Sequence, residues 1–123
     1  MARILVVEDD DTLLGVVSEF LDGLGHDTLR ASSGREAIHL LTVEESPVDL
    51  ALVDWQMAGI NGRGVVDHIR RECPRTEVLV STGLTPRHVT RTSAGRHARA
   101  ILRKPFSLRQ LALTIDQVLN PTT

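Results

Sequence analysis

The chain has 123 residues, of which 41% are apolar and only 2% aromatic, and its formal net charge is −2. This length fits one domain with one core built from aliphatic side chains. A single cysteine excludes an internal disulfide framework, and no apolar run approaches the length of a membrane span. Acidic residues at positions 8–11 also interrupt any apolar leader, so we expect a cytoplasmic location.

The first half of the chain alternates aliphatic runs with helical patterns. In chain order it predicts a strand at residues 3–7, a helix over 13–24, a strand at 28–31, a second helix over 34–41 and a strand at 50–53. Gly25 is the expected end of the first helix. Ser33 and Glu36 have the spacing of a capping box that opens the second helix. Pro47 separates that helix from the third strand.

The second half continues the same alternation. It predicts a third helix around residues 65–69, a strand at 78–81, a fourth helix from Pro86, a strand at 100–102 and a last helix over 108–119. Val89 is nearly the only large apolar residue of the fourth helix, so we expect that helix to be the least stable. Ser107 and Gln110 predict another capping box.

Five strand–helix units in succession predict an α/β fold. Right-handed crossovers would wind these units into a doubly wound, five-stranded parallel sheet with helices on both faces. The scarcity of aromatic residues agrees with this, because strands of parallel sheets read as short aliphatic runs. We expect a single domain over residues 1–123.

Charged residues follow three of the predicted strands. Glu8 and Asp9 follow the first, Asp54 the third and Lys104 the fifth. Ligands of such sheets bind outside the carboxyl ends of the strands, so we expect these three ends side by side. Two carboxylates about 4 Å apart repel by roughly 4 kcal/mol at an effective dielectric near 20, so the cluster needs a lysine or a divalent cation. Oxygen ligands and a phosphate-bearing ligand favour Mg²⁺.

Four motifs together resemble the receiver domain of two-component response regulators. They are residues 4–10 (ILVVEDD), 52–62 (LVDWQMAGING), 81–83 (STG) and 104–106 (KPF). Each follows a predicted strand, and together they span nearly the whole chain in the order of that family. The resemblance implies a flavodoxin-like (βα)5 fold and a single receiver domain over residues 1–123.

The resemblance also implies a metal site. Asp9 resembles the main acidic ligand of Mg²⁺, with Glu8 binding through water or helping to hold the metal. Asp54 and the backbone carbonyl of Gln56 resemble the remaining protein ligands. The five histidines are scattered without a pair at metal spacing, so we interpret them as structural or surface residues.

For the chemistry, the resemblance implies that Asp54 is a phosphoacceptor. Thr82 resembles the hydroxyl and Lys104 the ammonium that neutralise phosphoryl oxygens, which is the main requirement of phosphoryl transfer. Gln56 and Leu84 resemble positions that control the access of hydrolytic water, and the apolar Leu84 would slow hydrolysis. We expect no enzyme in the ordinary sense, only Mg²⁺-dependent self-phosphorylation from a donor and slow autodephosphorylation.

The sequence departs from the family pattern at Ile101. An aromatic residue usually stands three places before the lysine, and isoleucine has no ring to move, so we expect transmission through the fourth helix and the loop before it. Residues 1–77 carry a net charge of −8 and residues 78–123 a net +6, with no Asp or Glu between Val78 and Ile115. Residues 87–103, called the basic segment below, are either a solvated face or a docking surface for an acidic partner.

The expected function is a phosphorylation-controlled switch in a two-component phosphorelay. The donor would be a sensor histidine kinase or a histidine phosphotransfer protein, and a downstream protein would bind the face of the fourth helix, fifth strand and fifth helix. We expect no direct contact with nucleic acid or membrane. The alternatives are a phosphorylation-independent receiver-like binding module and a small metal-dependent phosphatase. No helix-turn-helix pattern follows the last helix, so the domain would act alone or belong to a longer protein.

Overall fold

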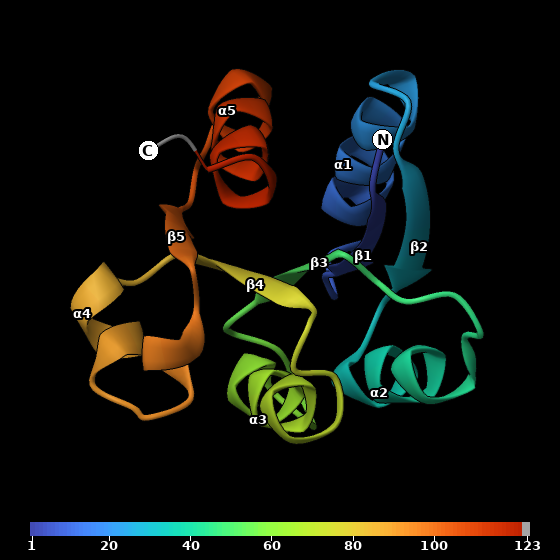
Figure 1. Ribbon diagram of the computed structural model, residues 1–123. Coiled ribbons are helices and arrows are strands. Elements are labelled where there is room, and N and C mark those ends of the chain that lie inside the picture. The colour runs from blue at the N-terminus through green and yellow to red at the C-terminus, as the bar shows by residue number, and fades with distance from the viewer. Residues whose placement is uncertain (122–123) are drawn as a thin grey trace.

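The computed structural model describes residues 1–121 and contains a five-stranded parallel sheet in the order β2-β1-β3-β4-β5 (Figure 1). The strands are β1 (Arg3–Val7), β2 (Asp27–Ala31), β3 (Leu50–Asp54), β4 (Glu77–Thr82) and β5 (Ala100–Arg103). The helices are α1 (Asp11–Gly23), α2 (Gly34–Val43), α3 (Gly62–Glu72), α4 (Pro86–Thr90) and α5 (Leu108–Leu119), with a short 3₁₀ helix, η1 (Gly95–His97), after α4. The predicted α/β doubly wound fold is confirmed.

Helices cover both faces of the sheet, α1 and α5 on one and α2, α3 and α4 on the other (Figure 1). Alternate residues of each strand enter different cores. Ile4 and Val6 of β1 pack with side chains of α1 and α5, whereas Leu5 and Val7 pack with side chains of α2 and α3. The sheet is therefore buried on both sides, as its continuous aliphatic strands require.

The helix ends agree with the capping patterns in the sequence. The side chain of Asp10 caps α1, and Ser107 and Gln110 form a complete capping box at α5. The predicted box at α2 is only half formed, because the Ser33 hydroxyl accepts the Glu36 N–H but the Glu36 carboxylate bonds to a neighbouring serine hydroxyl instead. Gly25 has a φ of +94°, which is the left-handed conformation expected after α1.

The fourth helix is the shortest α-helix among the described residues. It spans five residues, and Val89 is its one buried residue. Gly95 of η1 lies so close to α4 that an added Cβ would stand 1.9 Å from the Val89 carbonyl oxygen. The short length and single buried residue of α4 agree with its poor apolar pattern in the sequence, while its low stability stays a prediction.

One expectation about the strand ends is wrong. β4 lies between β3 and β5, so the ends of the first, third and fifth strands are not immediate neighbours. Lys104 still reaches the first and third strand ends because its side chain is long. The predicted domain boundary at residue 123 lies outside the described residues. Among residues 1–121, every helix is too short or too polar to span a membrane.

Candidate functional site

Glu8, Asp54 and Lys104 converge because each continues the alternation of its strand. Ile4 and Val6 precede Glu8 at every second position, and all three side chains belong to the sheet face covered by α1 and α5. Leu50 and Leu52 stand in the same relation to Asp54, and Leu102 to Lys104. The period of the strand therefore directs the charged side chains to one face at the carboxyl end of the sheet.

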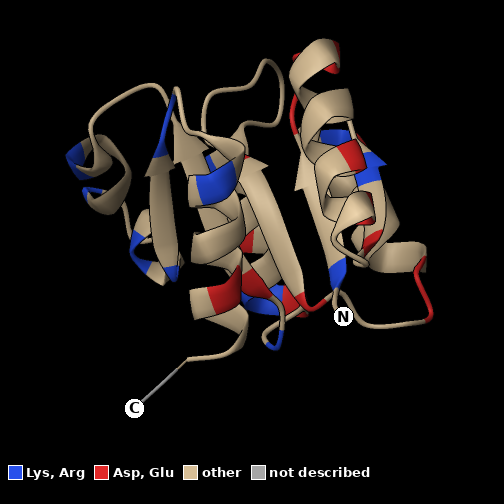
Figure 2. Cartoon of the chain, turned by 90° about the horizontal axis from the view of Figure 1, so that it is seen from above, with Lys and Arg blue, Asp and Glu red and all other residues tan. Residues whose placement is uncertain are grey.

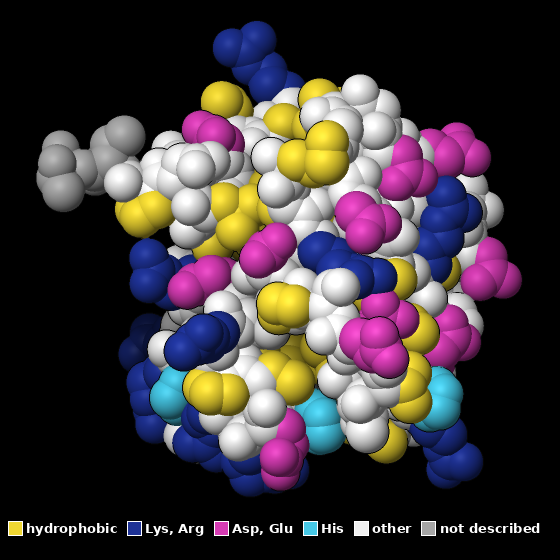
Figure 3. All heavy atoms as spheres, turned by 45° about the vertical axis from the view of Figure 1, so that its right-hand side comes forward, with side chains coloured by type: hydrophobic (Ala, Val, Ile, Leu, Met, Phe, Trp, Pro, Cys, Tyr) yellow, Lys and Arg dark blue, Asp and Glu magenta, His cyan; other side chains and the backbone are white. Residues whose placement is uncertain are grey.

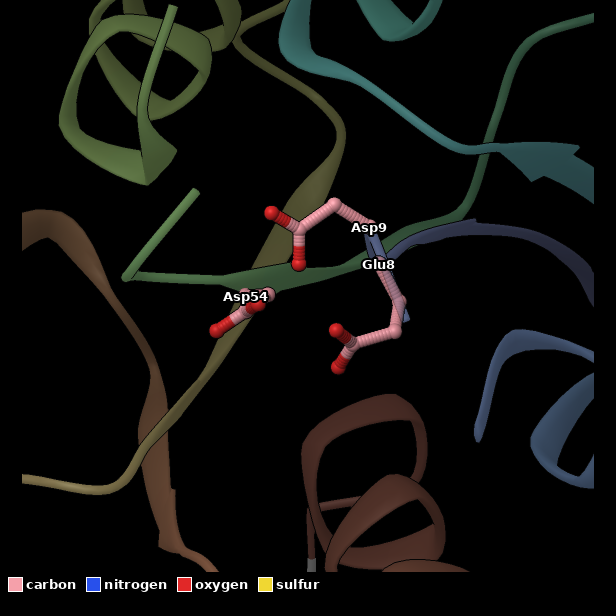
Figure 4. Close-up of side chains that lie close together, drawn as sticks. All are labelled: Glu8, Asp9 and Asp54. Carbon is pink, nitrogen blue, oxygen red and sulfur yellow. The ribbon is translucent and has the colours of Figure 1, made fainter. Parts of the chain in front are cut away.

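The three acidic residues form a compact pocket. Carboxylate oxygens of Glu8, Asp9 and Asp54 lie within 4.8 Å of one another, pointing together from the ends of β1 and β3 (Figure 4). Glu8 is 5% exposed and Asp54 2% exposed, whereas Asp9 is open to solvent. Within the described chain this is the one group of three or more acidic, histidine or cysteine side chains close enough to share a metal ion.

Lys104 neutralises the buried part of this pocket. Its Nζ lies 2.8 Å from Glu8 Oε1 and 3.4 Å from Asp54 Oδ1. Backbone groups supply further compensation, since the Gln56 N–H donates to Asp54 Oδ1 at 3.2 Å and the Asp10 N–H donates to Glu8 Oε2 at 3.2 Å. One ammonium thus serves two buried carboxylates, which leaves a net negative pocket suited to a cation.

The charge state of Asp54 reflects that imbalance. The pKa of Asp54 is raised from 3.8 to about 7, first by burial and then by the hydrogen bond and charge of Glu8, while Lys104 and the Gln56 N–H oppose the increase. Burial acts to lower the pKa of Lys104, but the hydrogen bond with Glu8 and the charges of Asp54 and Glu8 outweigh it and raise the pKa overall. The lysine therefore stays charged, and Asp54 is the group whose charge depends on its surroundings.

Thr82 lies at the end of β4 and joins the pocket through Gln56. Its hydroxyl donates to Gln56 Oε1 at 3.4 Å and accepts the Leu84 N–H at 3.0 Å. The Gly83 N–H donates to the same Gln56 oxygen at 2.8 Å. Sequence reasoning assigned Gln56 only through its backbone and its place in the family pattern, and no short-range pattern signals this bridge between two loops.

The candidate residues therefore gather as expected at the carboxyl end of the sheet. Glu8, Asp9, Asp54 and Lys104 share one pocket, and Thr82 is connected to it. The role of the Gln56 backbone carbonyl as a metal ligand stays a prediction. Cys73 is the residue that ends α3, where burial raises the pKa of its thiol.

The family model of the response regulator receiver domain matches residues 4–116. The chain belongs to the response regulator receiver domain family. The match covers the sheet except for Arg3 at the start of β1, includes the pocket described above, and confirms the resemblance drawn from the four motifs. The chain is therefore a receiver domain of the kind found in two-component signalling systems.

Individual relatives agree with this assignment. The chain is 28% identical over 120 residues to the response regulator SaeR of Staphylococcus aureus, covering 98% of this chain and 51% of that protein. It thus spans about half the length of the curated relatives it matches. A receiver domain of Clostridium thermocellum superimposes with a TM-score of 0.88 at 27% identity, covering 98% of this chain and 95% of the other. The response regulator TrrA of Thermotoga maritima, solved in complex with Mg²⁺ and BeF, superimposes with a TM-score of 0.84 at 26% identity. The match covers 97% of this chain and 100% of TrrA.

Proposed function

We propose that this receiver domain is a phosphoacceptor switch in a two-component phosphorelay, with Asp54 as the residue that takes the phosphoryl group. The observation that carries this proposal is the buried Asp54 carboxylate beside the Lys104 ammonium, 3.4 Å away, at the carboxyl end of the sheet. A structural ion pair alone would not need a second buried carboxylate and an exposed third one. The excess of negative charge supports a site that functions with a bound cation.

The donor set fits Mg²⁺. Three carboxylates supply hard oxygen ligands, and the exposure of Asp9 leaves room for the waters that Mg²⁺ retains. We propose that Glu8, Asp9, Asp54 and the Gln56 carbonyl hold the ion, as the presence of Mg²⁺ in the structure of TrrA supports. When bound, the ion would supply positive charge for the phosphoryl oxygens.

The transfer step follows from the positions of the protein groups. A carboxylate oxygen of Asp54 attacks phosphorus, the P–N bond of a phosphohistidine breaks, and the imidazole leaves with the electron pair and takes a proton from solvent. Lys104 and the Thr82 hydroxyl neutralise phosphoryl oxygens, so the protein contributes positioning and electrostatic stabilisation. Slow hydrolysis of the acyl phosphate would end the signal, and the domain is not a turnover enzyme.

We assign the phosphoryl donor to a sensor histidine kinase or a histidine phosphotransfer protein, and the output to a downstream protein. Figure 2 shows several Lys and Arg on the side of the sheet that carries α4 and β5, and Figure 3 shows a group of them at the lower left, with others scattered among the acidic side chains. The exposed arginines of the basic segment are Arg87, Arg91, Arg96, Arg99 and Arg103. They favour an acidic protein partner at the face of α4, β5 and α5, without nucleic acid or membrane.

A second candidate is a receiver-like module that binds its partner without phosphorylation. Ile101 favours it, because this partly buried residue packs against the core and offers no ring or hydroxyl to move. The presence of Glu8, Asp54 and Lys104 together in one pocket favours the phosphoacceptor function instead. The cytoplasmic location stays a prediction.

Intact-mass spectrometry after incubation with acetyl phosphate and Mg²⁺ tests the proposal. We expect the mass of one phosphoryl group to be added to the natural chain. No addition is expected when Mg²⁺ is chelated beforehand or in the Asp54→Asn variant. Asp116→Asn on the exposed face of α5 is the matched control and should be modified like the natural chain. Absence of modification in the natural chain would favour the phosphorylation-independent module.

A further inference from the structure

The side chain of Gln56 connects the two loops that border the pocket. Its backbone N–H bonds to the Asp54 carboxylate, while its side-chain oxygen accepts the Gly83 N–H at 2.8 Å and the Thr82 hydroxyl at 3.4 Å. The approach is close, since an added Cβ on Gly83 would stand 3.3 Å from this oxygen. The loop after β3 and the loop after β4 are thus held together by one carboxamide oxygen.

The hydroxyl hydrogen that Thr82 donates to Gln56 is the one that a phosphoryl group on Asp54 would also accept. The Thr82 hydroxyl has a single hydrogen, which points to Gln56, and its oxygen already accepts the Leu84 N–H. A phosphoryl oxygen on Asp54 can bond to this hydroxyl only if that hydrogen leaves Gln56. The charged phosphoryl oxygen is the stronger acceptor, because hydrogen bonds to ionised groups are about twice as strong as neutral ones.

We propose that Gln56 is a positioning residue whose carboxamide oxygen holds Thr82 and Gly83 in the resting state and is displaced by the phosphoryl group. This inference rests on the proposed function and adds a regulatory step to it. Displacement frees the Gly83 N–H and loosens residues 83–85, which lead directly into α4. The exchange couples Asp54 to the least anchored helix without any movement of Ile101.

Amide hydrogen exchange at Gly83 tests the resting-state contact without phosphate or metal. Gln56→Leu removes the acceptor at similar length, and we expect exchange at Gly83 to rise about 10-fold or more. Gln56→Glu keeps an oxygen acceptor and should preserve the protection. Gln117→Leu, at an exposed glutamine of α5, is the matched control and should behave like the natural chain. Unchanged exchange at Gly83 in Gln56→Leu would overturn the inference.

Beryllofluoride affinity tests the displacement itself. Trp55, the one tryptophan, follows Asp54 and packs against the core, so its fluorescence can report a Mg²⁺–beryllofluoride titration. We expect Gln56→Leu to bind beryllofluoride about 3- to 10-fold more tightly than the natural chain or Gln117→Leu, because one competing hydrogen bond is removed. Equal or weaker binding by Gln56→Leu would overturn the inference while leaving the proposed function intact. Failure of the natural chain itself to bind would overturn both.

A double-mutant cycle with Thr82→Val identifies the competing hydrogen. Without the Thr82 hydroxyl there is no competition for it, so Gln56→Leu should then change beryllofluoride affinity by less than about 2-fold. Retention of the full increase in the Thr82→Val background would show that Gln56 acts by a different route and would contradict the exchange.

Discussion

The two charged regions of this molecule are built in opposite ways. In the pocket, strand alternation directs Glu8, Asp54 and Lys104 to one point, where the lysine forms ion pairs with both carboxylates. In the basic segment, positive side chains surround the five-residue helix α4 and the short 3₁₀ helix η1. Val89 is the buried residue of α4. Among the described residues, Arg99 has an ion pair with Glu77 at 3.5 Å, while Arg96 bonds to a carbonyl of the same segment.

This difference shows where a change of charge can produce movement. The pocket lies at the ends of packed strands, so its side chains are held in place before any ligand binds. The basic segment has few buried apolar groups, and local opening costs least where such contacts are few. A new charge at Asp54 is therefore expected to alter the basic segment and to leave the sheet unchanged.

We expect the largest effect from removal of the Lys104 ammonium from the pocket. Lys104→Met leaves Glu8 and Asp54 without their shared ammonium, so we expect phosphorylation by acetyl phosphate to slow about 100-fold or more. Arg109→Met, which removes a positive charge from the exposed surface of α5, should leave the rate nearly unchanged. A loss of less than about 3-fold in Lys104→Met, measured by intact mass over time, would contradict the role of this lysine.

The next prediction changes the packing of the basic segment without touching the pocket. Gly95→Ala forces a Cβ against the Val89 carbonyl, so we expect a loss of about 1–3 kcal/mol in unfolding free energy with phosphorylation of Asp54 retained. Gly15→Ala in α1 meets nothing within 4 Å and should instead stabilise the protein by about 0.5–1 kcal/mol. Denaturant unfolding measures both, and an undiminished stability of Gly95→Ala would refute the tight packing of η1 on α4.

A smaller effect concerns the pH dependence of the pocket without Mg²⁺. The pKa of Asp54 is raised to about 7 in the folded protein, so the folded state binds the extra proton and stability falls as pH rises from about 4 to 7. Asp54→Asn removes this penalty and should stabilise the metal-free protein by about 1–2 kcal/mol at pH 8. The gain should shrink toward pH 4.

Thermal unfolding of both proteins across this pH range gives the comparison. Addition of Mg²⁺ should stabilise the natural chain more than Asp54→Asn, because binding to the folded state raises the apparent stability. A stability difference that did not vary with pH would mean that Asp54 is ionised throughout the range.

The smallest expected effect is on the lifetime of the acyl phosphate. Leu84 is 39% exposed and stands two places after Thr82, and we expect its apolar side chain to hinder the approach of water. Leu84→Asn should shorten the lifetime by roughly 3- to 10-fold, which is less than the roughly 10²- to 10⁴-fold that a positioned general acid or base contributes. The decay of phosphorylated protein by mass spectrometry is the measurement, and an unchanged lifetime would count against this role.

The sequence predicted the parts of the fold that depend on local pattern. Aliphatic runs identified β1, β3, β4 and β5, residues 28–31 were predicted as a strand without such a run, and Ser107 with Gln110 identified the start of α5. The convergence of Glu8 and Asp54 could also be predicted, because strand alternation is a local property. The contacts made across loops could not. The sequence did place Lys104 beside the acids, but not the intervening strand β4 that its side chain passes. The bridge from Gln56 to Gly83 and the fit of Gly95 under α4 depend on the angles between elements, which no short pattern encodes.

A phosphoryl analogue bound at Asp54 is expected to change the conformation of the basic segment. An NMR titration of the isotope-labelled chain with beryllofluoride and Mg²⁺ tests it most directly. We expect the amide signals of Gly83 and of residues 87–103 to shift together, with one saturation curve, and neither to shift in Asp54→Asn. Shifts confined to the pocket, with the signals of the basic segment unchanged at saturation, would show that binding at Asp54 does not reach that segment.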